Sequence, residues 1–148
     1  MTLIAQLGLA TVLVAVTVVT HLAGIALLLT ILRRHRHVRR RFVAAIINTA
    51  AILSAAFGLF ALHALEIWTW AGTYWWLGIF GDFEHALYFS TSTFVTIGYG
   101  DIVLGPDARI LGAIEGANGI ILIGWSTAFF FSIVDRLKLL ERDFERNR

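Results

Sequence analysis

Three long stretches of this 148-residue chain carry no charged residue, and the segments between them carry charges. The uncharged stretches are Thr2–Leu32, Phe42–Leu65 and Ile120–Val134. An apolar run of about 18 residues or more is long enough to cross a bilayer as a helix. A chain this short cannot bury three such helices in a soluble core, so the pattern predicts an all-α integral membrane protein with three transmembrane helices.

The composition supports a membrane protein. Apolar residues make up 58% of the chain and charged residues 15%, against about 45–50% and about 25% in soluble domains. No cysteine is present, which excludes disulfides and thiolate metal sites. The sequence shows no nucleophile–base pair, metal-ligand cluster or phosphate-binding loop, so we expect no enzymatic activity, no cofactor and no small-molecule substrate. We interpret His21 as a packed or interfacial histidine and a pairing of His63 with Glu66 as structural.

The basic residues predict how the chain is oriented. Six of the twelve Lys and Arg residues lie in RRHRHVRRR (33–41), and five follow Asp135 in the tail. Positively charged loops remain cytoplasmic, so we expect a multi-pass protein of the plasma (inner) membrane with its N-terminus outside and its C-terminus cytoplasmic. Topology explains this charge without a nucleic-acid partner. Binding of membrane lipids by the basic loop, or titration of His35 and His37, remains an alternative.

The outer end of the second span is rich in aromatic and acidic residues. Tryptophan and tyrosine concentrate at membrane–water interfaces, and we predict a belt there. Its members are Trp68, Trp70, Tyr74, Trp75 and Trp76. Five acids also lie in the outer segment and would attract cations. They are Glu66, Asp82, Glu84, Asp101 and Asp107, opposed only by Arg109.

A short helix is expected between the second and third spans. Asp82 is a suitable N-cap, and Glu84 lies in the first turn, where the helix dipole favours an acid. The helix, at 83–95, is too short to cross a bilayer. Irregular backbone at membrane depth is tolerated only where protein buries it or where it lines a water-filled path. Because both flanking spans end outside, we predict a re-entrant helix and loop.

The segment TIGYGD, Thr96–Asp101, follows this helix directly. Glycine adopts positive φ without a steric penalty, and Gly98 and Gly100 are spaced so that successive backbone carbonyls can point the same way. Such carbonyls would replace the water shell of an ion, together with the Thr96 hydroxyl. We expect the Tyr99 side chain to point outward against aromatic neighbours, with Tyr88 and Phe89 as candidates.

TIGYGD resembles the selectivity filter of pore-loop potassium channels, in which backbone carbonyls coordinate K⁺. The similarity extends over about Phe83–Arg136 and is closest to small bacterial channels of the two-transmembrane pore class, with an extra N-terminal span here. Ile97 replaces the commoner valine, and Ser92 stands where some relatives have an acid. The resemblance implies a homotetramer in which four chains surround one pore and K⁺ passes through it passively.

This resemblance implies a division of the chain into four parts. An extra N-terminal transmembrane helix covers 1–32, the basic cytoplasmic loop 33–41, the pore domain 42–136 and a short cytoplasmic tail helix 137–148. The pore domain comprises an outer helix at 42–70, the pore helix at 83–95, the filter at 96–101 and the inner helix at 106–135.

The candidate site residues fall into three groups. K⁺ is expected to bind Thr96, Ile97, Gly98, Tyr99 and Gly100. Filter support is expected from Tyr88, Phe89, Ser92, Asp101 and Glu115. A hinge or gate is expected at Gly119, Gly124 or Phe129, although close packing and lipid contact are equally good reasons for these residues.

Glu115 is unusual because charged residues inside spans are energetically costly. It shares a helical face with Asn118, Leu122, Ser126, Phe129 and Ile133. We expect this face to meet the pore or the pore helix, with Glu115 either bracing the filter or satisfied near the interface.

Two alternatives to a potassium channel remain from the sequence. One is a weakly selective cation channel, and the other is a non-conducting, channel-associated membrane subunit. A voltage sensor needs arginines placed regularly within a span. The arginines here lie between spans, which argues against a dedicated voltage-sensing domain.

Overall fold

The computed structural model describes residues 1–33 and 41–146, with side chains described for 1–32 and 46–135. Four α-helices make up most of this part of the chain: α1 (Leu3–Arg33), α2 (Arg41–Trp76), α3 (Phe83–Phe94) and α4 (Arg109–Arg146). Three segments are long and apolar enough to cross a membrane: Leu3–Leu32, Ile46–Trp76 and Arg109–Asp135. The predicted all-α membrane fold with three spans is therefore confirmed.

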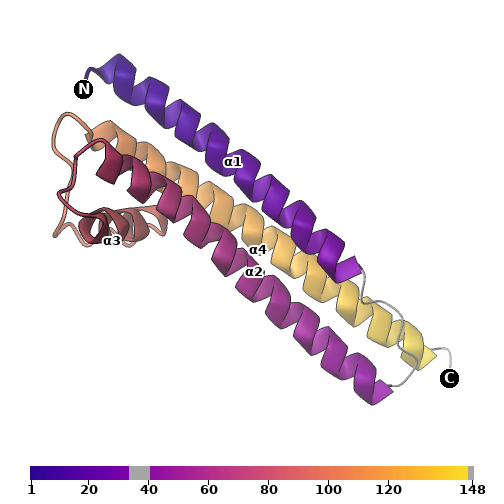
Figure 1. The fold of residues 1–148 in the computed structure, drawn as a ribbon. Helices are drawn as coiled ribbons and strands as arrows, with labels where there is room; N and C mark the ends of the chain where they lie inside the picture. The colour runs from indigo at the N-terminus through magenta and orange to yellow at the C-terminus, as the bar shows by residue number, and fades with distance from the viewer. Residues whose placement is uncertain (34–40, 147–148) are drawn as a thin grey trace.

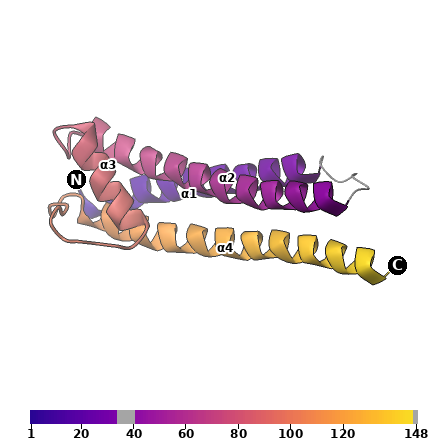
Figure 2. The ribbon, with the colours of Figure 1, turned by 90° about the horizontal axis from the view of Figure 1, so that it is seen from below.

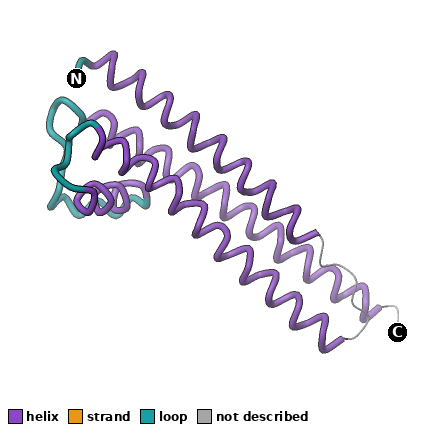
Figure 3. Tube along the Cα trace, in the orientation of Figure 1, coloured by secondary structure: helices purple, strands orange, loops and turns teal. Residues whose placement is uncertain are grey.

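The long helices α1, α2 and α4 lie side by side, and the short α3 packs across one end of the bundle (Figure 1). Figure 2 shows α3 crossing from the end of α2 toward α4. The start of α1, the end of α2 and the start of α4 share this end, so α1 and α4 run in one direction and α2 in the other. Most of the irregular backbone also gathers there (Figure 3).

Two helices extend beyond the expected limits. The second span was expected to end at 70, but α2 continues to Trp76. Gly78, two residues after the end of α2, has a positive φ of 68°. Gly78 N–H donates to the Trp75 carbonyl and Ile79 N–H to the Tyr74 carbonyl, both at 3.0 Å, which is a Schellman C-cap. The other difference concerns α4, which runs unbroken from Arg109 to Arg146. The inner helix was expected at 106–135, with the tail continuing as a short helix at 137–148.

The expectations for the basic loop fall partly outside the described residues, since 34–40 and 147–148 are not described. His35 and His37 belong to this part of the chain.

The first helix packs along a narrow buried stripe. Its buried residues are Gln6, Ala10, Leu13, Thr17 and His21. Their spacing of three or four residues places them on one side of a helix. Two glycines then bring α1 and α2 close together, as small residues do between membrane helices. A Cβ built on Gly24 would lie 2.5 Å from a Leu62 methyl, and one on Gly58 would lie 2.4 Å from a Leu28 methyl.

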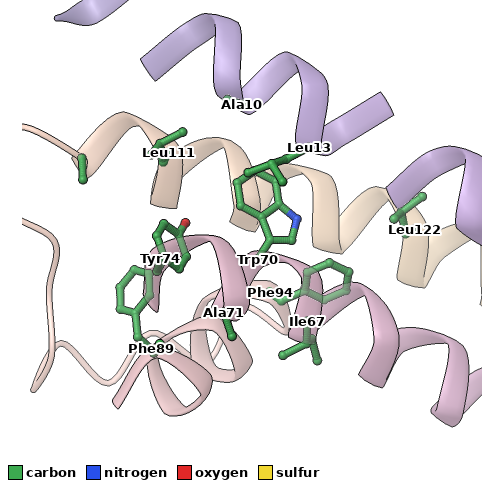
Figure 4. Close-up of a cluster of buried hydrophobic side chains, with 12 residues drawn as sticks. Ala10, Leu13, Ile67, Trp70, Ala71, Tyr74, Phe89, Phe94, Leu111 and Leu122 are labelled. Atoms are coloured by element: carbon green, nitrogen blue, oxygen red, sulfur yellow. The ribbon is translucent and has the colours of Figure 1, made fainter. Parts of the chain in front are cut away.

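The hydrophobic core lies beside α3, where all four helices contribute side chains (Figure 4). Trp70 and Tyr74 are fully buried in it, so the expectation that they join an interfacial belt is wrong. Their rings point into the core because they lie on the face of α2 that packs against the other helices. Trp68, Trp75 and Trp76 are exposed and remain suitable for an interface.

Candidate functional site

The short helix α3 descends into the bundle from the end where the loops gather. Its first residue, Phe83, stacks edge-on against Trp75, with ring centroids 6.0 Å apart. Its last residue, Phe94, lies 6.0 Å from the ring of His63. Trp75 and His63 are separated on α2 by about 18 Å at 1.5 Å per residue. The carboxyl end of α3 is therefore deep in the bundle, and the following residues return toward the loops.

An N-cap fixes the outer end of α3. Asp82 has an extended backbone, with φ −142° and ψ 165°, and its Oδ1 accepts a hydrogen bond from His85 N–H at 2.9 Å. This backbone bond, followed by the bond to the His85 ring, lowers the pKa of Asp82. The same carboxylate raises the pKa of His85. The expected cap at Asp82 is thus present, strengthened by a neighbour that the sequence pattern did not indicate.

The backbone from Thr96 to Gly100 alternates in conformation. Positive φ occurs at Thr96 (60°), Gly98 (57°) and Gly100 (78°). The glycines adopt this conformation freely, whereas Thr96 does so at about 1–2 kcal/mol. Thr96 was identified from the sequence for its carbonyl and hydroxyl, and its positive φ was not foreseen. Its place two residues before Gly98 was the signal that could have indicated it.

The end of α3 holds this strained start of the loop in place. The carbonyl of Ser92 accepts hydrogen bonds from Ile97 N–H (2.8 Å) and Gly98 N–H (3.1 Å), while Thr96 N–H donates to the Thr93 carbonyl (3.0 Å). The Ser92 hydroxyl donates to its own helix, at the Phe89 carbonyl. Ser92 therefore supports the loop through its backbone and not through its side chain.

The side chains around the loop point to different neighbours. Tyr88 donates a hydrogen bond to Asp101 at 2.8 Å, which lowers the pKa of Asp101 and raises that of Tyr88. Phe89 is buried and packs on Tyr74 and Phe80 at the back of α3, with centroids 5.5 and 5.4 Å away. Within the described part of one chain, the ring contacts of Phe89 are with these two residues, and its expected contact with Tyr99 remains a prediction.

The whole loop from Thr96 to Asp101 is exposed in a single chain. Ile97 keeps 52% and Tyr99 68% of its surface exposed. No ring contact involves Tyr99 within the described residues. In a single chain, therefore, both the backbone of this loop and its two large apolar side chains remain uncovered.

Glu115 joins three helices behind this loop. It is fully buried on α4 and accepts hydrogen bonds from Tyr74 on α2, at 2.8 Å, and from the Ser90 hydroxyl on α3. Ser90 also lies 3.1 Å from the Ile67 carbonyl. The carboxylate braces α3 from behind through Ser90, two residues away from the Ser92 position considered from the sequence.

The face of α4 that carries Glu115 packs inside the chain. Asn118 donates a hydrogen bond to Thr17 on α1 at 2.8 Å, and the Ser126 hydroxyl lies 3.5 Å from Nε2 of His21. Leu122 and Ile133 on the same face are buried, and Phe129 is half-buried. This face meets α3, the helix that was predicted to be the pore helix, and also α1, which was not expected. The exposed residues of α4 lie on other faces and include Ile120, Ile121, Gly124, Trp125 and Phe131.

The two candidate hinge glycines differ in their surroundings. A Cβ built on Gly119 would lie 2.0 Å from the Phe94 carbonyl oxygen, so Gly119 allows α4 to touch the backbone of α3. Nothing lies within 4 Å of a Cβ built on Gly124. Within one chain, packing accounts for Gly119 and leaves Gly124 without a packing role.

A second buried polar cluster joins α1 and α2, and the sequence did not predict that its three residues come together. Glu66 was assigned to the outer acidic surface but is fully buried, with Nδ1 of His21 and Nδ1 of His63 each 2.8 Å from one of its oxygens. The three-residue spacing of His63 and Glu66 places them on one helical face. The contribution of His21, from another helix and 45 residues earlier, has no local sequence signal.

Comparison with known families identifies the class of protein. Residues 46–136, more than half of the chain, match the ion channel family in its two-transmembrane form. The chain belongs to this family, which is consistent with a pore-loop channel, and it is a multi-pass membrane protein. The matched segment covers α3, the TIGYGD loop and Glu115 and begins after α1. Neither the comparison with curated proteins nor that with solved structures gives a match.

Proposed function

We propose that four copies of this chain form a potassium-selective channel that conducts K⁺ passively through a ring of TIGYGD loops. The chain lies in the plasma membrane, with the loop end of the bundle outside and the basic residues cytoplasmic. The pore domain corresponds to 42–136, and α1 is an additional helix packed outside it.

The alternating backbone of the filter carries this proposal. A dehydrated K⁺ ion needs several oxygens, which potassium filters supply from rings of backbone carbonyls. Positive φ at every second residue, Thr96, Gly98 and Gly100, allows successive carbonyls to face one side of the chain. The ligands are the carbonyls of Thr96, Ile97, Gly98 and Tyr99, together with the Thr96 hydroxyl, and Gly100 completes the alternating pattern.

The exposure of this backbone in one chain supports assembly around it. Backbone groups inside a membrane must be buried in protein or line a water-filled path. One copy contributes one strand of oxygens and leaves Ile97 and Tyr99 largely exposed. Neighbouring copies would cover these side chains and complete the rings around the ion.

Electrostatics favour a cation on both sides of the filter. The carboxyl end of α3 lies deep in the bundle, and the partial negative charge of a helix C-terminus stabilises a nearby cation. At the outer end the exposed acids are Asp82, Glu84, Asp101 and Asp107. Arg109 is the one exposed Lys or Arg in this part of the described chain, so four copies would form an acidic entrance.

Two hydrogen-bonded braces keep the filter in register. Tyr88 on α3 holds Asp101 just beyond the filter, and Glu115 on α4 holds Ser90 behind α3. We assign the hinge to Gly124, because its surroundings leave α4 room to bend there. Gly119 and the half-buried Phe129 instead pack inside the chain.

The proposal is tested by flux from liposomes containing the purified protein and a K⁺ gradient. Wild-type protein is expected to pass K⁺ and to exclude Na⁺. Gly98→Ala places a side chain at φ 57°, where an L-residue is strained, and should abolish K⁺ flux by disturbing the carbonyl ring. Gly78→Ala is the matched control, because Gly78 has φ 68° and open surroundings but lies outside the filter.

The possible outcomes separate the candidate functions. Loss of flux in Gly98→Ala with retention in Gly78→Ala supports the filter assignment. Equal passage of Na⁺ and K⁺ by wild-type protein would indicate a weakly selective cation channel. An assembled protein that passes neither ion would indicate a non-conducting subunit.

A further inference from the structure

The buried cluster of His21, His63 and Glu66 has the ligand set of a transition-metal site. Each residue offers one ligand atom, and these atoms all lie within 4.8 Å of one another. Two imidazoles and one carboxylate form a common set for Zn²⁺, which leaves a fourth position open. We propose that these three residues bind one Zn²⁺-like divalent ion and thereby fasten α1 to α2.

The side chains must adjust to accept an ion, because the three ligand atoms lie within 4.8 Å of one another. Ligands at about 2.1 Å in a tetrahedral site are about 3.3–3.4 Å from one another. Nδ1 of His21 is 2.8 Å from Oε1 of Glu66 and Nδ1 of His63 is 2.8 Å from Oε2, so each pair must open by about half an ångström if both oxygens face the ion. The two rings, with centroids 5.5 Å apart, must approach each other slightly.

The charge of the cluster favours a cation. Glu66 lies in a membrane span with no exposed surface, and both of its ion-pair partners are histidines. Among the side chains described, at 1–32 and 46–135, no Lys or Arg pairs with it. With two neutral imidazoles the carboxylate remains a buried charge, which is costly within a span. A metal ion would place positive charge directly against it.

Ser126 on α4 can hold the His21 ring in either state. With a proton on Nδ1 of each ring, both rings donate to Glu66, and the Ser126 hydroxyl donates to Nε2 of His21. In the metal-bound state each Nδ1 supplies a lone pair and each ring carries its proton on Nε2, and the Ser126 hydroxyl then accepts a hydrogen bond from Nε2–H of His21. A hydroxyl can both donate and accept, and such partners orient metal-bound histidines.

The site has an opening and lies beside the filter support. The His63 side chain keeps 18% of its surface exposed, whereas His21 and Glu66 have none, so an ion would enter past His63. The His63 ring also contacts Phe94, two residues before Thr96. An ion held here would connect α1 and α2 with the deep end of α3.

Metal binding is measured on the purified full-length channel without a histidine tag, by uptake of Co²⁺ or Zn²⁺ after dialysis. His35 and His37 are replaced with Ala in every sample, so that the basic loop contributes no imidazole. We expect one ion per chain, Co²⁺ absorption bands of a four- or five-coordinate site, an increase in Tm with Zn²⁺, and no effect of Mg²⁺, which prefers oxygen ligands.

Substitutions of two ligands, of one hydrogen-bond partner and of one control residue locate the site. His63→Gln and Glu66→Gln should weaken binding more than 100-fold, beyond the about 10–100-fold typical for partners that only orient a ligand. Ser126→Ala should weaken it about 10-fold. His85→Ala should leave binding unchanged, because His85 forms a similar histidine–carboxylate pair with Asp82 but on the exposed surface.

Metal binding is measured without ion flux, so the proposed metal site can be refuted while the proposed channel function stands. If the substituted chains do not assemble, the electron paramagnetic resonance spectrum of Cu²⁺ bound to otherwise native protein still decides the matter. Splitting from two imidazole nitrogens supports the site. Absence of bound metal, or binding that persists in both His63→Gln and Glu66→Gln, would overturn it and leave a hydrogen-bonded cluster neutralised by a proton.

Discussion

Glu115 and Glu66 are both fully buried carboxylates in membrane spans, but different side chains hold them. Glu115 accepts hydrogen bonds from the hydroxyls of Tyr74 and Ser90, which keep their protons and bind no metal readily. Glu66 faces the rings of His21 and His63, and imidazole nitrogens are common metal ligands. We call the first arrangement the brace of α3 and the second the connection between α1 and α2.

The packing around the two carboxylates differs in the same way. One helical turn from Glu115, Gly119 lies against the backbone of Phe94. Near the Glu66 cluster, Gly24 lies against the end of the Leu62 side chain, which can change rotamer. The interface behind the TIGYGD loop thus brings a glycine against backbone, while the interface between α1 and α2 brings a glycine against a side chain.

The largest effect on stability is expected from removing Glu115, the centre of the brace of α3. Glu115→Ala should lower the free energy of unfolding in detergent by about 3–5 kcal/mol, because it leaves a cavity and leaves the buried Tyr74 hydroxyl without its acceptor. Glu66→Ala should lower it by about 1–3 kcal/mol, since the two imidazoles can pair with each other. Equal losses for the two substitutions would contradict the contrast between brace and connection.

A matched pair of glycine substitutions compares the two interfaces next. Gly119→Ala should destabilise the assembled protein by about 3 kcal/mol, because a Cβ would lie 2.0 Å from a backbone oxygen that cannot easily move. Gly24→Ala should cost less than about 1 kcal/mol as Leu62 adjusts, and Gly124→Ala provides a control with open space. Thermal unfolding measures all three, and a tolerated Gly119→Ala would remove the packing explanation.

The hydrogen bond between Asn118 and Thr17 tests how firmly α1 is attached. A double-mutant cycle with Thr17→Val and Asn118→Leu should give a coupling of about 0.6–1.7 kcal/mol, which runs from the average to the largest value for hydrogen bonds between membrane helices. Thr11 is exposed and bonds only to its own helix, so Thr11→Val paired with Asn118→Leu should give no coupling. Equal coupling in both cycles would show that the contact contributes nothing specific.

The smallest effect concerns protonation beyond the filter. The hydrogen bond from Tyr88 lowers the pKa of Asp101, so this contact is present above the ordinary aspartate pKa and is lost as pH falls through the lowered value. Tyr88→Phe should therefore raise the pKa of Asp101, so that the carboxylate becomes protonated at a higher pH than in wild type. A carboxyl NMR titration measures this, and an unchanged pKa would contradict the contact.

The sequence indicated the features that depend on local pattern. Long uncharged runs predicted the three spans, and Asp82 predicted the start of α3, because a span and a cap need only neighbouring residues. The glycine spacing in TIGYGD likewise predicted the positive φ of Gly98 and Gly100. The roles of the filter residues in K⁺ binding remain predictions.

The features that the sequence did not indicate depend on contacts between distant segments. Glu66 was read as an outer acid because its nearest companion, His63, was visible and His21 was not. Trp70 and Tyr74 were placed in an interfacial belt because composition cannot distinguish the lipid-facing side of α2 from its core side. The preference of Glu115 for Ser90 over Ser92 follows from which side of α3 meets α4.

The position of bound ions in the assembled protein tests the central claim most directly. Anomalous scattering from Tl⁺, used in place of K⁺, would locate permeant ions in a structure of the membrane-embedded complex. We predict ions on a fourfold axis, surrounded by the carbonyls of Thr96, Ile97, Gly98 and Tyr99 from four chains. Loops that lie apart from one another, with no ion between them, would contradict the assignment of TIGYGD as a potassium filter.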